Sequence, residues 1–148
     1  YYPRRPVKSF QDLEVYQKLL AVAVVIVKKT GQGDKGTSFT LSTSGNIGSG
    51  TVAALHECAL SLPIKIAAAH SLRFGNTEQA IRILEEIMVG CNKIVVYLEL
   101  YRDLYNDNKI ETEFFEEQIK NILSVRFKIL HLQRSWIKFT PSEVKTKK

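Results

Sequence analysis

Residues 77–105 read TEQAIRILEEIMVGCNKIVVYLELYRDLY, and this stretch decides the fold class. Its apolar residues recur at intervals of three and four, which is the period of an amphipathic helix. Asn76 or Thr77 supplies an N-cap, and at 1.5 Å per residue such a helix extends for about 40 Å. The main apolar stripe of this predicted helix consists of Ala80, Leu84, Ile87, Cys91, Val95 and Leu98.

A first helix is predicted upstream, followed by a long connection. Ser9 is a suitable N-cap with Asp12 as its acidic capping partner, and Lys28-Lys29 mark the basic C-terminal end. Residues 31–50 contain six Gly and seven Ser or Thr, a composition that cannot form a packed core. We therefore predict a flexible loop there. No strand precedes its glycines and no Gly-Lys-Ser/Thr sequence ends them, so a phosphate-binding loop is not expected.

Two more helices complete the pattern. One runs from about Thr51 with Pro63 inside it, where the missing N–H donor and the bulky ring predict a kink. The other is capped by Thr112 and runs from Glu113 to about Phe139. The inner face of this last helix consists of Phe115, Ile119, Ile122, Val125, Ile129 and Trp136.

Four amphipathic helices with short breaks between the last three predict an all-α fold, an antiparallel up-down-up-down four-helix bundle. The bundle is expected over residues 9–139, with the loop at 31–50 between its first two helices. A basic N-terminal arm, residues 1–8, precedes it, and a basic C-terminal tail, residues 140–148, follows it.

Composition narrows the class of protein. The 148 residues are 45% apolar and 24% charged, as in an ordinary single globular domain. Two cysteines, Cys58 and Cys91, fall inside apolar patterns and are interpreted as reduced core thiols of a cytoplasmic protein. The longest purely apolar run, Leu19 to Val27, is well short of the ~20 residues needed to span a bilayer. The N-terminal residues do not match a signal peptide, so neither secretion nor a membrane partner is expected.

The charge is concentrated at the two ends of the chain. The net charge is +6, and residues 119–148 carry eight Lys or Arg against a single acidic residue, Glu143. By contrast, residues 105–118 carry five Asp or Glu against one Lys. A polarised distribution of this kind is typical of proteins that bind a polyanion, although a solvated tail that only aids solubility has the same composition.

On the last predicted helix, basic residues line the side opposite the apolar face, with an aromatic ring among them. Lys and Arg on one helix face can follow phosphates, and a nearby ring can stack on a base. A solvated outer face is the competing interpretation. The candidate nucleic-acid-binding residues are Arg4, Arg5, Lys8, Lys120, Phe127, Arg134, Lys138, Lys145, Lys147 and Lys148.

The helices also carry more apolar residues than the single stripe that each helix of a bundle requires. Contiguous exposed apolar surface usually marks an interface, so a homo-oligomer is predicted, although a broad core with some exposed Leu and Ile is common. The candidate interface residues are Ile83, Ile94, Tyr97, Tyr101, Leu123 and Leu130.

No constellation in the sequence indicates an active site. His56, His70 and His131 are isolated from one another and from paired carboxylates. In a helix, His56 and Cys58 point about 200° apart and cannot share a metal ion. The sequence therefore predicts no enzyme activity, no metal and no cofactor.

Two segments resemble a known family. Residues 9–18, SFQDLEVYQK, and residues 61–67, SLPIKIA, are similar to motifs of the bacterial four-helix-bundle proteins. That family includes proteins encoded in intervening sequences of 23S ribosomal RNA genes and the accessory variability determinants of diversity-generating retroelements. This chain departs from the family pattern at residues 65–69, KIAAA in place of Asn-Ile-Ala-Glu-Gly, and at Gly90-Cys91 in place of Gly-Ser.

The resemblance implies a homopentamer with a basic face, RNA or RNA/DNA as ligand, and a reverse transcriptase as partner. The leading hypothesis is thus a non-enzymatic accessory protein of mutagenic retrohoming. The alternative is a protein of the intervening-sequence type that acts as a protein–protein scaffold without a reverse transcriptase. An enzyme working through the Gly-rich loop is a third, weaker hypothesis.

Overall fold

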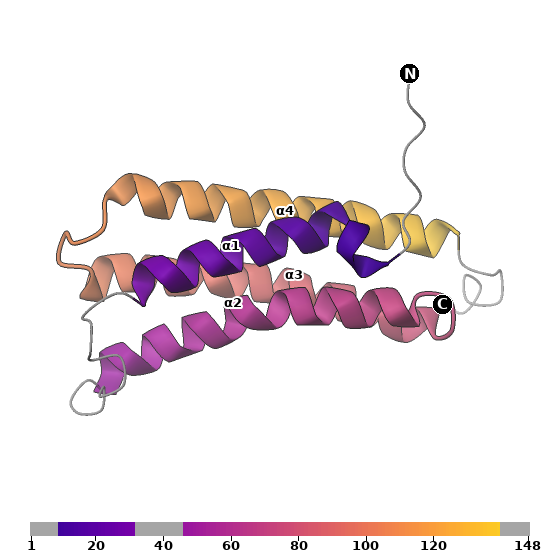
Figure 1. The fold of residues 1–148 in the computed structure, drawn as a ribbon, viewed down its shortest axis with the longest axis horizontal. Helices are drawn as coiled ribbons and strands as arrows, with labels where there is room; N and C mark the ends of the chain where they lie inside the picture. Colours follow the sequence, from indigo (N-terminus) through magenta and orange to yellow (C-terminus); the bar gives the residue numbers. More distant parts are fainter. Residues whose placement is uncertain (1–8, 32–45, 140–148) are drawn as a thin grey trace, which may run out of the picture.

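The computed structural model describes residues 9–31 and 46–139, and within these ranges it contains helices and no strand. The all-α prediction with four long helices is confirmed (Figure 1). The elements, in chain order, are the 3-10 turn η1 (Phe10–Asp12), α1 (Glu14–Thr30), α2 (Asn46–Leu72), α3 (Thr77–Leu100), the π-helix η3 (Tyr101–Tyr105) and α4 (Thr112–Lys138).

The four helices lie side by side along the long axis of the molecule (Figure 1). Each of α2 and α4 packs against both α1 and α3. The α2–α3 turn lies at the right-hand end of Figure 1, together with the end of α4, and the α3–α4 connection lies at the left-hand end. Residues that are distant in sequence therefore meet at the two ends of the molecule.

The core confirms the predicted stripe of α3, since five of its six residues are buried and Val95 packs against them. A second stripe of α3 is buried as well. Ile83 is 9% exposed and Ile94 is 1% exposed, so the expectation that these two residues form an exposed interface is wrong. The physical reason is that α3 packs against α2 on one side and α4 on the other, and one stripe cannot serve both contacts.

The helix starts follow capping chemistry with two exceptions. Ser9 and Asp12 form the expected capping box, but around the short turn η1, and α1 begins two residues later at Glu14. The Asn76 side chain accepts a hydrogen bond from Gln79 N–H and caps α3 as predicted. Thr112 is inside α4 rather than its N-cap, because the chain enters the helix at Glu111 in extended geometry.

α2 begins earlier than predicted. Its first residue is Asn46, so the last five residues of the predicted loop, 46–50, are helical, and residues 32–45 lie outside the described ranges. Pro63 lies inside this helix, where its predicted kink stays a prediction. α2 approaches α3 closely at Gly90, where an added Cβ would stand 2.7 Å from Leu62 Cδ2.

Part of α2, Gly50–Leu72, is long and apolar enough by length and composition to cross a membrane. A single helix of this kind is weak grounds for a membrane segment, since core helices often meet the same criterion. One face of α2 does serve the core, where Leu55, Leu62 and Ile66 are at most 1% exposed.

Candidate nucleic-acid interface

The outer side of α4 presents the predicted basic stripe. Lys120, Phe127, Arg134 and Lys138 are all exposed and follow one another at intervals of seven, seven and four residues. Phe127 is 59% exposed, and its ring meets the His131 ring edge-to-face at 4.4 Å between centroids. The helical period therefore gathers two aromatic rings and three cations on one solvent-facing strip.

The basic residues of α4 divide into two groups. Lys128 lies 3.5 Å from Glu14 of α1, and Arg126 lies near the Cys91 thiol of α3. These two cations are turned toward neighbouring helices. Lys120 and Arg134 form no ion pair with any residue of 9–31 or 46–139. Their charge is available to an external anion.

Six of the predicted binding residues cannot be placed. Arg4, Arg5 and Lys8 of the arm, together with Lys145, Lys147 and Lys148 of the tail, lie outside the described residues.

A cluster of aromatic and basic residues that the sequence did not predict lies where α4 ends beside the α2–α3 turn (Figure 1). We name this cluster the aromatic end. It consists of Arg73, Phe74, Trp136, Lys138 and Phe139. The Arg73 guanidinium lies 4.8 Å from the Phe74 ring centroid and 5.2 Å from that of Trp136. The Lys138 ammonium lies 5.8 Å from the Phe139 centroid. Each distance is within the range of a cation–π interaction. The sequence signal was a Phe between Arg and Gly in a turn, where no core position is available.

The predicted interface residues are distributed unequally. Tyr97, Tyr101 and Leu130 are half-buried and pack against the core, whereas Leu123 is 45% exposed. Burial also raises the pKa of the Tyr101 phenol above its ordinary value. Of the six candidates, Leu123 alone belongs to the exposed apolar residues, so the predicted set does not describe a continuous apolar surface.

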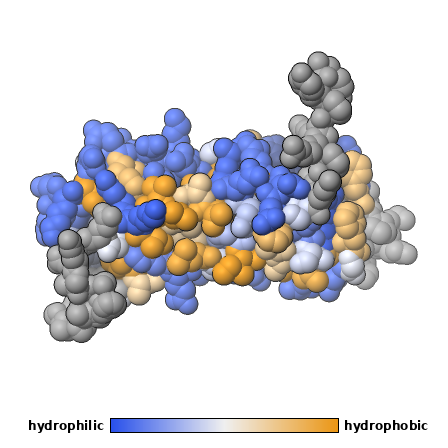
Figure 2. All heavy atoms as spheres, in the orientation of Figure 1, coloured by the Kyte–Doolittle hydropathy of each residue, from blue (hydrophilic) through white to orange (hydrophobic). Residues whose placement is uncertain are grey.

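Other exposed apolar residues form two faces. On the outer surfaces of α3 and α4, Val89 and Val96 of α3 are about half exposed, as is Leu123 of α4, and Val89 also borders the groove between α2 and α3. We name Val89, Val96 and Leu123 the α3–α4 face. On the opposite side, Figure 2 shows apolar residues gathered over the middle of α1 and α2. This α1–α2 face includes Leu20, Val24, Leu60 and Ile64.

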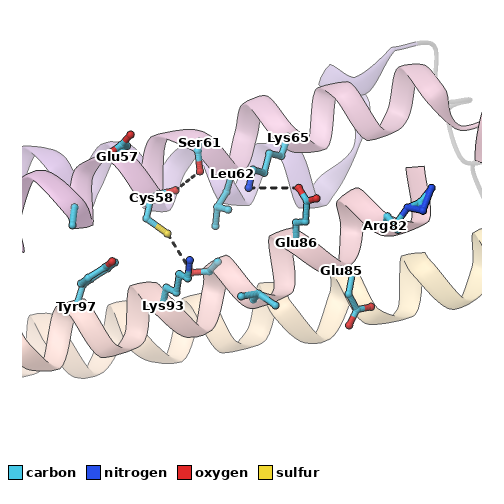
Figure 3. Close-up of a pocket in the computed structure, with 13 residues that line it drawn as sticks. Glu57, Cys58, Ser61, Leu62, Lys65, Arg82, Glu85, Glu86, Lys93 and Tyr97 are labelled. Carbon is cyan, nitrogen blue, oxygen red and sulfur yellow. Dashed lines mark hydrogen bonds and ion pairs between the residues drawn. The ribbon is translucent and has the colours of Figure 1, made fainter. Parts of the chain in front are cut away.

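A groove of about 690 Å³ lies between α2 and α3 (Figure 3). Lys65 of α2 and Glu86 of α3 bridge it at 3.7 Å, and Cys58 Sγ lies 3.5 Å from the carbonyl oxygen of Gly90. Burial raises the pKa of the Cys58 thiol despite the nearby Lys93 and Lys65, so the sulfur is not an activated nucleophile. The groove therefore offers no assembled catalytic group.

His56 and Cys91 are two further titratable groups that lie at least partly inside the helix packing. The Thr30 hydroxyl donates to the Ile26 carbonyl and so accepts from Nε2–H of His56, 2.7 Å away. Burial lowers the pKa of His56, and burial raises the pKa of Cys91 to about 12. In the described part of the chain, no group of three His, Cys, Asp or Glu residues could hold a metal ion.

Comparison with protein-family models, with characterised proteins and with solved structures finds no match to this chain. The function of the protein is therefore inferred from its surfaces and from the resemblance in residues 9–18 and 61–67.

Proposed function

We propose that this protein is a non-enzymatic, oligomeric RNA-binding accessory protein of the cytoplasm. The observation that carries the proposal is the outward stripe of α4, in which Lys120 and Arg134 have no ion-pair partner among the described residues and Phe127 is exposed beside them. Unpaired cations at helical intervals suit a phosphate backbone, and an exposed ring between them suits a base.

The architecture in this proposal is an antiparallel up-down-up-down bundle that assembles with copies of itself. The packing of α1 and α3 against both α2 and α4 supports the bundle. The α1–α2 face and the α3–α4 face support self-association, because two different apolar faces on opposite sides can pair from one copy to the next and close into a ring. Each copy then adds one α4 stripe, which raises avidity without new contacts.

The resemblance supplies the biological role. It favours a homopentamer that binds template RNA or RNA/DNA and associates with a reverse transcriptase in a diversity-generating retroelement. The basic character of α4 favours this branch over that of an intervening-sequence scaffold protein.

Binding to RNA at two salt concentrations tests the proposal. We expect the full chain to retain a structured RNA on a filter at 50 mM salt and to lose affinity steeply by 200 mM salt, because neutralising phosphates releases counterions. Light scattering of the same sample is expected to give the mass of an oligomer. A chain that stays monomeric at high concentration and retains no RNA at 50 mM salt contradicts the proposal.

A charge-reversal variant locates the interface. The triple variant Lys120→Glu, Arg134→Glu, Lys138→Glu is expected to lose RNA retention. The matched control, Lys65→Glu, Arg82→Glu, Lys93→Glu, makes the same change in net charge along the α2–α3 groove and is expected to retain RNA. If the α4 variant retains RNA while losing a protein partner in a pull-down, the scaffold function is the better description.

A further inference from the structure

The aromatic end carries the two most exposed large apolar side chains of the described residues. Phe74 is 84% exposed and Phe139 is 74% exposed, which exceeds even Ile64 at 70%. Both rings lie at the same end of the molecule, since Phe74 follows α2 and Phe139 follows α4 (Figure 1). An aromatic side chain gains considerably from burial, so two rings left in water at one place indicate a surface that a ligand covers.

The cations beside these rings restrict the chemistry of that ligand. The Arg73 guanidinium lies over the rings of Phe74 and Trp136, and the Lys138 ammonium lies over the ring of Phe139. Arg134, one turn before Lys138, forms no ion pair with a described residue. Acidic side chains are few in the elements that meet here. Glu78 lies in the first turn of α3 and Asp12 belongs to the Ser9 capping box, while Glu14 in the first turn of α1 already pairs with Lys18 and Lys128. A ligand with flat rings and negative charge fits this combination.

We propose that the aromatic end binds unpaired bases of single-stranded RNA, with bases stacked on Phe74 and Phe139 and phosphates beside Arg73, Arg134 and Lys138. Stacking requires bases that are free of a duplex, because paired bases present only their edges. The inference rests on the proposed RNA-binding function and adds a preference for single strands to it. Lys138 belongs to both surfaces, so a strand that follows the α4 stripe ends at these rings.

The molecule contains its own reporter for this contact. Trp136 is the only tryptophan of the chain, and its ring centroid lies 5.2 Å from the Arg73 guanidinium. A base that stacks at Phe74 changes the environment of Arg73 and hence the emission of Trp136. Tryptophan fluorescence therefore measures occupancy at this end rather than binding elsewhere on the molecule.

The test is a titration of the full chain with a 12-nucleotide oligoadenylate, followed by Trp136 fluorescence and by anisotropy of a labelled strand. A 12-base-pair RNA duplex serves as the second probe. We expect the double variant Phe74→Ala, Phe139→Ala to bind oligoadenylate about 10- to 100-fold more weakly and the duplex about equally well. Leu104→Ala is the matched control, since Leu104 is 62% exposed at the opposite end. Circular dichroism confirms that each variant is folded.

The outcomes separate this inference from the proposed function. If the wild type binds both probes and the double variant binds oligoadenylate as tightly as the wild type, the stacking site is wrong and RNA binding stands. If Trp136 emission does not change while anisotropy reports binding, the strand lies elsewhere and the inference is again overturned. If the wild type binds neither probe at 50 mM salt, both proposals fail together.

Discussion

The positively charged side chains have different neighbours at the two ends of the molecule. At the end where η3 and the start of α4 meet, cations pair with carboxylates: Arg102 donates two hydrogen bonds to Asp103, at 2.7 and 3.0 Å, and Lys29 lies 3.7 Å from Glu111. We name this the acidic end, residues 99–117. At the aromatic end, Arg73 and Lys138 lie over rings instead.

The difference separates cations that pair with neighbouring carboxylates from cations that lie beside exposed rings. Acidic residues at the start of α4 and basic residues at its end both interact favourably with the helix dipole. The separation of charge along α4 is therefore not by itself a sign of a ligand. At the acidic end the carboxylates also have local partners. The Arg102 hydrogen bonds lower the pKa of Asp103, and the backbone N–H of Glu111 together with Lys29 lowers the pKa of Glu111. The exposed rings at the other end have no such structural explanation.

The largest effect is expected at the acidic end and on stability alone. Asn106 is buried, and its side-chain amide donates to the Ile110 carbonyl and accepts from the Ile110 N–H, at 2.9 and 3.0 Å. Asn106→Ala leaves both backbone groups without these partners and is expected to lower the free energy of unfolding by about 2–4 kcal/mol in urea denaturation. RNA affinity is expected to stay unchanged.

The exposed Asn92 provides the control for this substitution, because Asn92→Ala removes the same side chain from the surface of α3. Its effect on stability is expected to be within about 0.5 kcal/mol. A loss of RNA binding in folded Asn106→Ala protein would show that the acidic end also contributes to the interface.

A smaller effect on stability is expected when one arginine at each end is replaced by alanine. Arg73→Ala removes a cation that lies over two rings. The substitution is expected to lower the free energy of unfolding by about 1 kcal/mol and RNA affinity by about tenfold. Arg102→Ala breaks an exposed pair and is expected to change neither quantity measurably. Equal losses of affinity in the two variants would mean that net charge, not the aromatic end, determines binding.

Sequence reasoning found those parts of the fold that local chemistry specifies. The Asn76 cap, the apolar stripe of α3 and the outward position of Lys120, Arg134 and Lys138 follow from spacing along a single helix. The two buried residues Ile83 and Ile94 could not be found in this way. Their burial depends on α3 having two neighbours, which is a property of the tertiary packing.

The aromatic end was missed for the same reason. Arg73 and Phe74 belong to a turn that is distant in sequence from Trp136 of α4, and only the packing brings the Arg73 guanidinium over the Trp136 ring. The early start of α2 at Asn46 has a different cause. Glycine and serine have a low helix propensity, which favours a loop. That preference is weak, and it is overridden at residues 46–50, which extend α2 at its N-terminal end.

Low pH also allows the two ends to be compared, because one partly buried histidine lies toward each end of the molecule. Burial lowers the pKa of His56, and burial together with Arg73 lowers the pKa of His70, from the ordinary value of 6.5. The unfolded chain binds protons at pH values where the folded chain does not. The stability that the neutral forms of His56 and His70 contribute is therefore fully present above about pH 6.5, and it is lost as the pH falls through their pKa values in the folded chain.

Thermal unfolding between pH 7.5 and 5 measures this loss, and His56→Gln and His70→Gln are each expected to remove part of it. RNA distinguishes the two histidines. Phosphates at the aromatic end favour the protonated form of His70, so binding is expected to tighten from pH 7 to pH 6 in the wild type and in His56→Gln, but not in His70→Gln. The same pH dependence in His70→Gln would place the strand away from this end.

The smallest effect is expected in the α3–α4 connection. Asn108 adopts a positive φ of 63°, a conformation that glycine accepts without strain and that asparagine tolerates better than other residues. Asn108→Gly is thus expected to raise the free energy of unfolding by only about 0.3–0.5 kcal/mol, because relief of strain is offset by the greater freedom of the unfolded chain. Asn108→Ala, which keeps a Cβ and loses the amide, is expected to lower it by about 0.5–1 kcal/mol. Since this connection touches no part of the aromatic end, both variants are expected to bind oligoadenylate like the wild type, and a change in that affinity would mean that the two ends are coupled through α3 and α4.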